Sequence, residues 1–224
     1  MVQIKVTKLT DVNLLRLANS FTSGKESKMS LAKAYAYRHS PIRTQMFAIE
    51  LTDIPLFVAS QLVRSHVGVQ WYQRSKRTDR GGEDFRIECY DFGQTLDTLA
   101  EYIDADMPQD KVNGIITALD EMETEVKSWA NKFDRYAPTD LLGVLNAEAI
   151  INMSHKRLCT KASLDTRAIW AQVVNAIRDI DPDLANHCVP QCVYCGFCSE
   201  PKGCGWIKSQ KGMAMRNDYL KLFE

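Results

Sequence analysis

The stretch PLFVASQLVRSHVGVQWYQRSKR, residues 55–77, places an apolar helical pattern directly before a dense group of cations. Pro55 suits the start of a helix, because the N–H group that proline lacks would have no intrahelical partner there. Gln61 and Arg64 are three residues apart, so we expect them to share one face of this helix. The cations that follow surround Trp71 and Tyr72. The stretch therefore predicts a helix followed by a basic segment with two aromatic residues.

This basic segment has the composition of a site for a phosphorylated, planar ligand. Guanidinium groups bind phosphate through paired hydrogen bonds, and aromatic rings can stack on a base or a flavin. A solvated basic loop and a nucleic-acid-binding patch have the same composition, since runs of charge are usually exposed. The residues of the segment alone leave all three interpretations open.

A second candidate site lies on a helix that Asn146 is expected to cap and that we expect to continue past Arg157. Arg157 and Lys161 are one helical turn apart on this otherwise apolar helix, which suggests a binding face. With His155 and Lys156 beside it, the same stripe also fits an exposed, charged surface.

Composition and charge narrow the class of protein. The 224 residues suffice for one large domain or two small ones, and 28 Lys and Arg balance 28 Asp and Glu. This neutral net charge gives no general attraction to nucleic acid or to an anionic membrane. The sequence contains no apolar run of about 18–20 residues and no apolar leader. We therefore expect a cytoplasmic protein with no membrane and no nucleic-acid partner.

Hydrophobic periodicity predicts a mixed α and β protein with more helix than strand. Strands are expected at 2–9 and 44–51, where side chains alternate in the period of a strand. Helices are expected at 110–133, from the spacing of the apolar residues, and at 163–180, where Asp181-Pro182 ends the pattern.

The order of these motifs resembles the flavin-dependent thymidylate synthase (thymidylate synthase-complementing protein) superfamily, from near the N-terminus to about residue 180. That family has a Pro-apolar-Phe-Val-Ala-x-Gln helix, then Arg-His-Arg, a short spacer and Asn-Glu-x-Ser-x-Arg. This chain has Pro55–Gln61, then Arg64-Ser65-His66, then Tyr72–Arg77, with one extra residue in the spacer. Further matches follow in the family's order at Ser20-Phe21, His39-Ser40-Pro41, Arg135, Asn146-Ala147, Asn152 and Arg157–Ala162.

The resemblance implies an α+β fold with helices packed on a mostly antiparallel sheet. It implies a catalytic domain at 1–186 and a short Cys-rich C-terminal tail at 187–224. It also implies a homotetramer that holds FAD and a pyrimidine nucleotide, dUMP, at subunit junctions. NADPH would reduce the flavin, and methylenetetrahydrofolate would supply the carbon that converts dUMP to dTMP.

Carried over by position, the resemblance implies three overlapping sets of site residues. The nucleotide would be bound by Gln61, Arg64, Ser75, Arg77, Arg135 and Arg157. FAD would be contacted by Ser20, Ser40, Arg64, His66, Asn146, Asn152 and Lys161. Catalysis would rest on Arg64, Gln73 and Arg157.

Two departures from the family's pattern affect the expected reaction. Ser65-His66 stands in place of His-Arg, so one cation at the flavin site is lost or becomes titratable. Tyr72-Gln73 stands in place of Asn-Glu, which removes a carboxylate close to the substrate. The alternatives are a relative that methylates or hydroxymethylates dUMP, dCMP or UMP, for example in viral DNA base modification, and an inactive scaffold.

Five of the seven cysteines crowd into residues 188–204. Cys192, Cys195, Cys198 and Cys204 have the spacing C-x2-C-x2-C-x5-C, which suits structural zinc or, less often, an iron–sulfur cluster. Metal-free thiols are the third interpretation. A nucleic-acid-binding protein with a zinc-ribbon-like tail is the alternative of another class. The neutral net charge and the lack of a finger spacing with paired histidines disfavour it.

Overall fold

The computed structural model describes residues 2–75, 107–115, 117–118, 135 and 137–223. The chain divides into two compact units, Met1–Gln73 with Pro138–Glu224, and Arg74–Ala137. In the second unit, residues 109–115 and 117–118 are helical, as the sequence predicts for the start of the helix at 110–133. The remainder of that predicted helix lies outside the described residues.

Within the described residues, the first unit is built on an antiparallel sheet of four strands in the order β1-β2-β4-β3. The strands are β1 (Gln3–Lys8), β2 (Met46–Pro55), β3 (Val69–Gln73) and β4 (Pro138–Asn146). One row of paired residues crosses the whole sheet, from Val6 through Ile49 and Gly143 to Trp71.

Burial alternates along the central strands, so the two faces of the sheet differ. On β2 the side chains of Phe47, Ile49 and Leu51 are buried, whereas the residues between them are half-buried. On β4, Leu141 is buried and Leu142 is 37% exposed. This period of two follows from the pleat of a strand, which points successive side chains to opposite faces.

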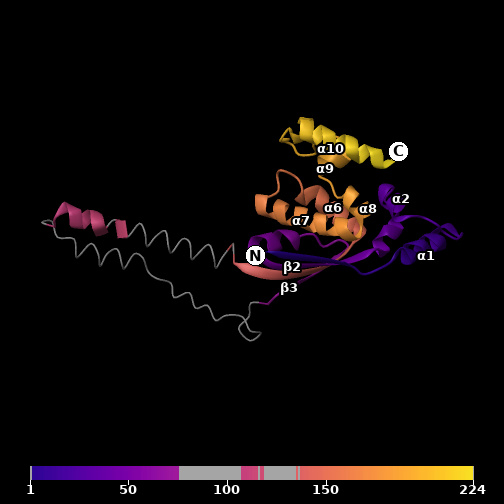
Figure 1. The fold of residues 1–224 in the computed structure, drawn as a ribbon, viewed down its shortest axis with the longest axis horizontal. Helices are drawn as coiled ribbons and strands as arrows, with labels where there is room; N and C mark the ends of the chain where they lie inside the picture. Colours follow the sequence, from indigo (N-terminus) through magenta and orange to yellow (C-terminus); the bar gives the residue numbers. More distant parts are fainter. Residues whose placement is uncertain (1, 76–106, 116, 119–134, 136, 224) are drawn as a thin grey trace. The chain divides into compact units, whose positions relative to one another are not determined.

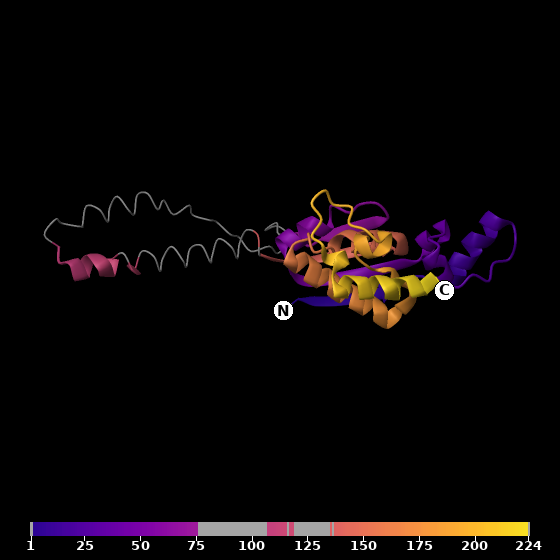
Figure 2. The same ribbon diagram turned by 90° about the horizontal axis from the view of Figure 1, so that it is seen from above.

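The buried face of the sheet is covered by α6 (Ala147–Arg157), α7 (Leu164–Ile180) and α8 (Pro182–His187). Figures 1 and 2 show this helical layer stacked on the strands. Trp170 of α7 is fully buried, and its Nε1 donates a hydrogen bond to Ser154 Oγ of α6 at 2.9 Å. The hydrophobic core therefore lies between the sheet and this layer.

The other helical elements of the first unit flank the core. They are α1 (Val12–Ser23), α2 (Leu31–Ala36), η1 (Ser40–Thr44), α3 (Leu56–Leu62), α9 (Gln191–Cys195), η3 (Trp206–Lys208), α10 (Gln210–Leu220) and η4 (Lys221–Phe223). In Figure 1, α9 and α10 lie on the side of α6 and α7 that faces away from the sheet. Across the described ranges, no helix combines the length and the apolar character needed to cross a membrane.

The predicted α+β class, with helices on an antiparallel sheet, is confirmed. The strands predicted at 2–9 and 44–51 correspond to β1 and β2. β3 and β4 are not evident from periodicity. The adjacent Leu141 and Leu142 interrupt the alternation in β4, and β3 is short and leads directly into the basic segment.

The prediction that the helix capped by Asn146 continues past Arg157 is wrong. Asn146 does cap α6, because its Oδ1 accepts a hydrogen bond from Ala149 N at 2.9 Å, but α6 ends at Arg157. The chain reverses into α7 over residues 158–163, with Ala162 N donating to Cys159 O at 2.9 Å. Lys161 therefore lies in this reversal and does not share a helical face with Arg157.

A buried carboxylate joins several elements of the first unit. Asp181, whose side chain is 2% exposed, ends α7 and caps α8, since Leu184 N donates to its Oδ1 at 3.0 Å. Its Oδ2 accepts from Lys8 Nζ at 2.6 Å and from Tyr35 Oη at 3.0 Å. Because Lys8 belongs to β1 and Tyr35 to α2, this one residue fixes the junction of α7 and α8 against the sheet and α2.

Replacing Asp181 with alanine should strongly destabilise the first unit. The change leaves the mostly buried Lys8 ammonium without its counter-ion and removes the cap of α8. Breaking a buried ion pair in this way costs about 3–5 kcal/mol in the free energy of unfolding. Urea denaturation followed by circular dichroism measures the loss. Asp179→Ala, at an exposed position on α7, is the control and should change the free energy by less than about 0.5 kcal/mol. Equal, small effects of both changes would contradict this role of Asp181.

Candidate functional site

Two of the predicted nucleotide-binding residues meet where α3, α6 and α7 come together. Arg157, at the end of α6, donates from Nη2 to the main-chain carbonyl of Gln61 in α3. The Gln61 Oε1 accepts from Thr166 Oγ1 of α7 at 3.0 Å and from Ser163 Oγ at 3.4 Å. The guanidinium and the carboxamide are therefore held by contacts between elements that are distant in sequence.

The charge at this junction is unbalanced. Arg157 Nε is buried and has no hydrogen-bond partner in the described part of the chain. Burial lowers the pKa of the Arg157 guanidinium, and the positive charge of Arg64 lowers it further. Neither arginine forms an ion pair with a carboxylate of the described residues. Two neighbouring cations that no described carboxylate neutralises form an arrangement that a bound anion would stabilise.

The segment that carries Arg64 and His66 is held at both ends by the sheet. Trp71 of β3 donates from Nε1 to Ser65 O at 2.8 Å, and its ring packs on Gly143, where an added Cβ would lie 2.4 Å from it. Gly68 O accepts from Asn146 N at 3.0 Å. Arg64 and His66 are exposed, so this well-held segment presents both side chains outward.

Two of the predicted flavin contacts already have structural roles. Asn146 Oδ1 caps α6, which leaves Nδ2 as the group available to a ligand. Ser20 Oγ donates to Arg16 O at 2.8 Å and accepts from Ser27 N at 2.9 Å, so it ties the end of α1 to the following loop. Ser40, the first residue of η1, is exposed.

A further polar cluster lies around Asn152, which was also predicted to contact flavin. Arg38 donates from Nη1 to Asn152 Oδ1 at 3.4 Å, and its Nη2 lies 2.8 Å from His155 Nε2. The guanidinium also lies over the Tyr194 ring, 4.7 Å from its centroid, and His155 stacks on the same ring. Arg38 has a backbone φ of 51°, in the left-handed region that non-glycine residues rarely adopt.

Burial determines the charge of His155, and its hydrogen bonds determine which ring nitrogen carries the proton. Burial lowers the pKa of His155 to about 4, so its imidazole is neutral near pH 7. Its Nδ1 lies 2.8 Å from Val189 O and donates to it, which leaves Nε2 to accept from Arg38.

Arg38 and Thr166 are not among the site residues predicted from the sequence. The signal in the sequence that could have identified Arg38 is its position directly before the motif His39-Ser40-Pro41.

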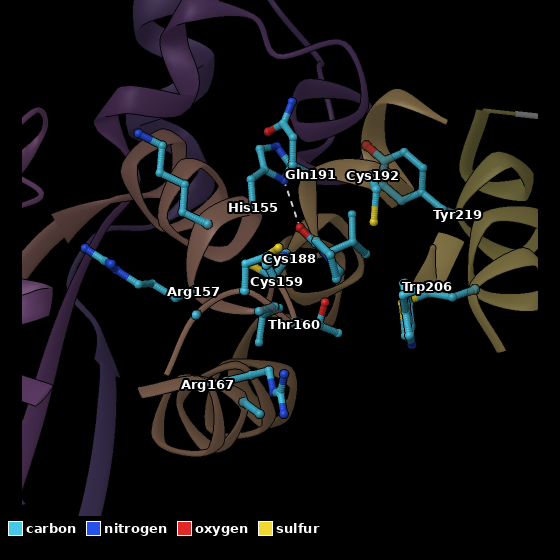
Figure 3. A pocket seen from close by; sticks show the side chains of 18 of the residues that line it. His155, Arg157, Cys159, Thr160, Arg167, Cys188, Gln191, Cys192, Trp206 and Tyr219 are labelled. Carbon is cyan, nitrogen blue, oxygen red and sulfur yellow. Dashed lines mark hydrogen bonds between the residues drawn. The ribbon is translucent and has the colours of Figure 1, made fainter. Parts of the chain in front are cut away.

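A cavity of about 1130 Å³ adjoins the end of α6 and is lined there by α6 and by the Cys-rich segment, residues 187–224. Arg157 and Lys161 belong to its wall. Figure 3 shows Arg157 and Cys159 on one side of this cavity and Trp206 and Tyr219 on the other. We call it the thiol pocket, because its lining includes Cys159, Cys188, Cys192, Cys198 and Cys204.

The structure does not gather the predicted metal ligands into a ready-made site. Among the described residues, no three side chains of His, Cys, Asp or Glu are placed so that they could hold a metal ion. Cys192, Cys198 and Cys204 line the thiol pocket, whereas Cys195 does not. The Cys195 Sγ instead accepts from Gln191 Nε2 at 2.9 Å.

The other predicted site residues lie elsewhere. Gln73 is exposed at the end of β3, and its Nε2 donates to Thr139 Oγ1 at 3.4 Å. Ser75 and Arg135 belong to the second unit, and Arg77 lies outside the described residues. Their roles in nucleotide binding stay predictions.

Comparison with known proteins identifies the fold. No protein-family model matches the sequence, and no curated protein matches it either. Thymidylate Synthase X from Helicobacter pylori, crystallised with FAD and dUMP, is 18% identical, and the match covers 84% of this chain and 99% of that one with a TM-score of 0.51. A second structure of the flavin-dependent enzyme from Helicobacter pylori, complexed with FAD and dUMP, gives a TM-score of 0.52 at 17% identity over 83% and 99% of the two chains.

The UMP/dUMP methylase PolB from Streptomyces cacaoi, bound with 5-Br dUMP, also has this fold. It is 13% identical, and the match covers 88% of this chain and 96% of that one with a TM-score of 0.50. The chain thus has the fold of the flavin-dependent thymidylate synthases, as its motifs predict.

Acid should destabilise the first unit through its buried histidines. Burial lowers the pKa of His155 from 6.5 to about 4, and it lowers that of His187 to about 4 as well. As the pH falls from 6.5 towards 4, the unfolded chain therefore binds these protons first, and the free energy of unfolding decreases. Urea denaturation above and within this window measures the decrease.

His155→Gln should reduce this acid-dependent loss, because one of the two groups is gone. His39→Gln, at an exposed position, is the control and should keep the full loss. The explanation fails if the parent and His155→Gln lose the same free energy over the window.

Proposed function

We propose that the chain is an FAD-dependent enzyme that transfers a one-carbon unit from methylenetetrahydrofolate to C5 of a pyrimidine nucleotide. The conversion of dUMP to dTMP is the first candidate reaction. The observation that carries the proposal is the buried Nε of Arg157, which has no hydrogen-bond partner in residues 2–75 and 137–223 and lies beside Arg64. It occurs in a fold whose solved examples include proteins crystallised with FAD, dUMP and 5-Br dUMP.

The nucleotide would be bound by the group of residues around Arg157. The guanidinium groups of Arg157 and Arg64 suit a phosphate or a pyrimidine carbonyl, because both are oxygen acceptors that form charge-assisted hydrogen bonds. Thr166 donates to the side-chain Oε1 of Gln61, so the Nε2 of the same carboxamide remains as a donor for the nucleotide. Donors aimed at a pyrimidine carbonyl would also stabilise the negative charge that develops when C5 becomes nucleophilic.

The residues of the predicted flavin site fit an anionic cofactor only in part. Asn152 and Arg38 are joined in one polar cluster, and His66 and Ser40 are exposed. Ser20 fits less well, since its hydroxyl is already used within the chain. Bound FAD would accept a hydride from NADPH and deliver reducing equivalents to the transferred carbon, while these side chains orient the cofactor and balance its charge.

Methylation or hydroxymethylation of dUMP, dCMP or UMP is the second candidate function. Gln73 occupies the position of a carboxylate in the family's pattern, which changes the proton chemistry available next to the base. The structural match to a protein described as a UMP/dUMP methylase supports testing a ribonucleotide as well.

We also propose that the chain forms a homotetramer with sites at subunit junctions. Leu14, Leu17 and Phe21 lie at helical spacing on α1 and are 42%, 53% and 83% exposed. An apolar stripe of this kind commonly marks a protein–protein contact.

The purified chain should bind FAD and modify a pyrimidine nucleotide. Bound flavin is measured by its absorption after gel filtration and by a thermal stability that rises with FAD concentration. Asn152→Ala should weaken FAD binding, whereas Asn217→Ala, at an exposed position on α10, should not. Mass spectrometry after incubation with NADPH, methylenetetrahydrofolate and dUMP, dCMP or UMP then identifies the product. Protein that neither retains FAD nor gains stability from it would refute the flavin assignment.

Arg157→Lys should weaken nucleotide binding while the fold is retained. Lysine keeps the charge but loses the forked donors, one of which holds the Gln61 carbonyl. Loss of a charge-assisted contact should reduce the affinity for dUMP about ten- to a hundred-fold. Lys211→Ala removes an exposed cation on α10 and is the control. Calorimetric titration of the FAD-saturated protein measures both, and unchanged affinity in Arg157→Lys would remove Arg157 from the proposed site.

A further inference from the structure

Four of the five cysteines that line the thiol pocket come from three separate segments. Cys159 lies in the reversal between α6 and α7, and Cys192 lies in α9. Cys198 and Cys204 lie in the irregular segment 196–205 that joins α9 to η3. One thiol therefore comes from the body of the first unit and three come from the Cys-rich segment.

Direct contacts bring these segments close together. Thr160 Oγ1 donates to Cys204 Sγ at 3.0 Å, so the residue after Cys159 touches the last cysteine of the Cys-rich segment. Cys198 packs on Gly203, where an added Cβ would lie 3.4 Å from its Sγ. The four cysteines thus line one cavity, and one hydrogen bond directly joins the segments that carry Cys159 and Cys204.

The remaining cysteines of this region are engaged elsewhere. Cys195 Sγ accepts from Gln191 Nε2 and does not line the pocket. Cys188 is buried, its Sγ donates to Leu184 O at 3.4 Å, and burial raises the pKa of its thiol to about 12. Cys188 also lines the pocket, but its burial and its hydrogen bond leave its thiol less available to a ligand than the other four.

The charges of the pocket wall suit thiolates. Lys156, Lys161 and Arg167 line the same cavity as the four cysteines. A zinc ion with four thiolate ligands carries a net charge of about −2, since Zn²⁺ is divalent and each bound thiol is deprotonated. Cations and hydroxyl donors around such a site, like Thr160 beside Cys204, stabilise that charge and orient the ligands.

We propose that Cys159, Cys192, Cys198 and Cys204 together bind one structural Zn²⁺, with Cys159 in place of Cys195 in the set predicted from spacing. Four thiolates in a tetrahedral arrangement are a preferred environment of zinc. The ion would tie the Cys-rich segment to the chain immediately after Arg157. The metal site is independent of the proposed one-carbon reaction.

Formation of the site requires the segment around Cys198 and Cys204 to close on the ion, since no three ligands of the described residues are yet in place. Gly196 and Gly205 bound this segment and have φ values of 84° and 76°. These are backbone conformations that glycine adopts without strain, so the chain can turn sharply at both ends of the segment. Metal binding commonly supplies the free energy for closure of this kind.

Zinc analysis of matched variants tests the ligand set. The reduced, full-length protein should bind one equivalent of Zn²⁺ per chain, as measured by elemental analysis after gel filtration. Cys159→Ser should lose that equivalent, and Cys195→Ser should keep it. Cys159→His should retain zinc, because a Cys3His set also binds zinc tetrahedrally, and it separates loss of a ligand from loss of the fold.

Alkylation of the parent protein provides a second test that needs no variant. With Zn²⁺ bound, Cys159, Cys192, Cys198 and Cys204 should resist iodoacetamide, and a chelator should make all four reactive together, as read by peptide mass spectrometry. Zinc lost from Cys195→Ser but kept by Cys159→Ser would overturn the proposed set. A folded, reduced parent that binds no zinc, or thiols whose reactivity does not respond to the chelator, would overturn the site itself.

Discussion

The arrangement of the first unit depends on the hydrogen bonds and the ion pair that the buried Asp181 carboxylate forms. It is nearly inaccessible to water, and a buried charge is tolerated only when its hydrogen-bonding capacity is filled. Lys8, Tyr35 and Leu184 fill it with one cation, one hydroxyl and one main-chain N–H. Burial, followed by the charge of Asp181, raises the pKa of Tyr35 well above its ordinary value, so the phenol remains a donor. The contacts of Asp181 therefore fix the C-terminal end of α7 against β1 and α2.

The opposite end of α7 contributes to the candidate site. Thr166 lies in its first turn and holds the Gln61 carboxamide, while Arg157 lies at the last position of α6. A cation at the C-terminus of a helix is stabilised by the unpaired carbonyl groups there, which offsets part of the cost of burying Arg157. The site is thus built from the ends of regular elements, and the core determines where those ends lie.

Local signals in the sequence predict much of this architecture. The alternation in β1 and β2, the capping residue Asn146 and the stop of α7 at Asp181 are all confirmed. Interactions between distant residues could not be predicted in the same way. Nothing near Lys8 identifies a partner 173 residues away, and nothing in α6 indicates that His155 meets Arg38. The family resemblance indicates Gln61, Arg64 and Arg157, but only packing reveals that Thr166 fixes the first and that the Arg157 Nε has no partner among the described residues.

The backbone conformation of Arg38 has a consequence for substitution at this position. A left-handed conformation costs an L-residue roughly 1 kcal/mol relative to glycine, and glycine would remove that cost. Glycine would also remove the guanidinium that joins Asn152, His155 and Tyr194. The gain in backbone conformation and the loss of these contacts are of similar size, so glycine at position 38 would exchange a local cost for a loss of cohesion between the turn after α2, α6 and α9. A positive φ at a non-glycine residue is thus kept here because the side chain joins elements that are distant in sequence.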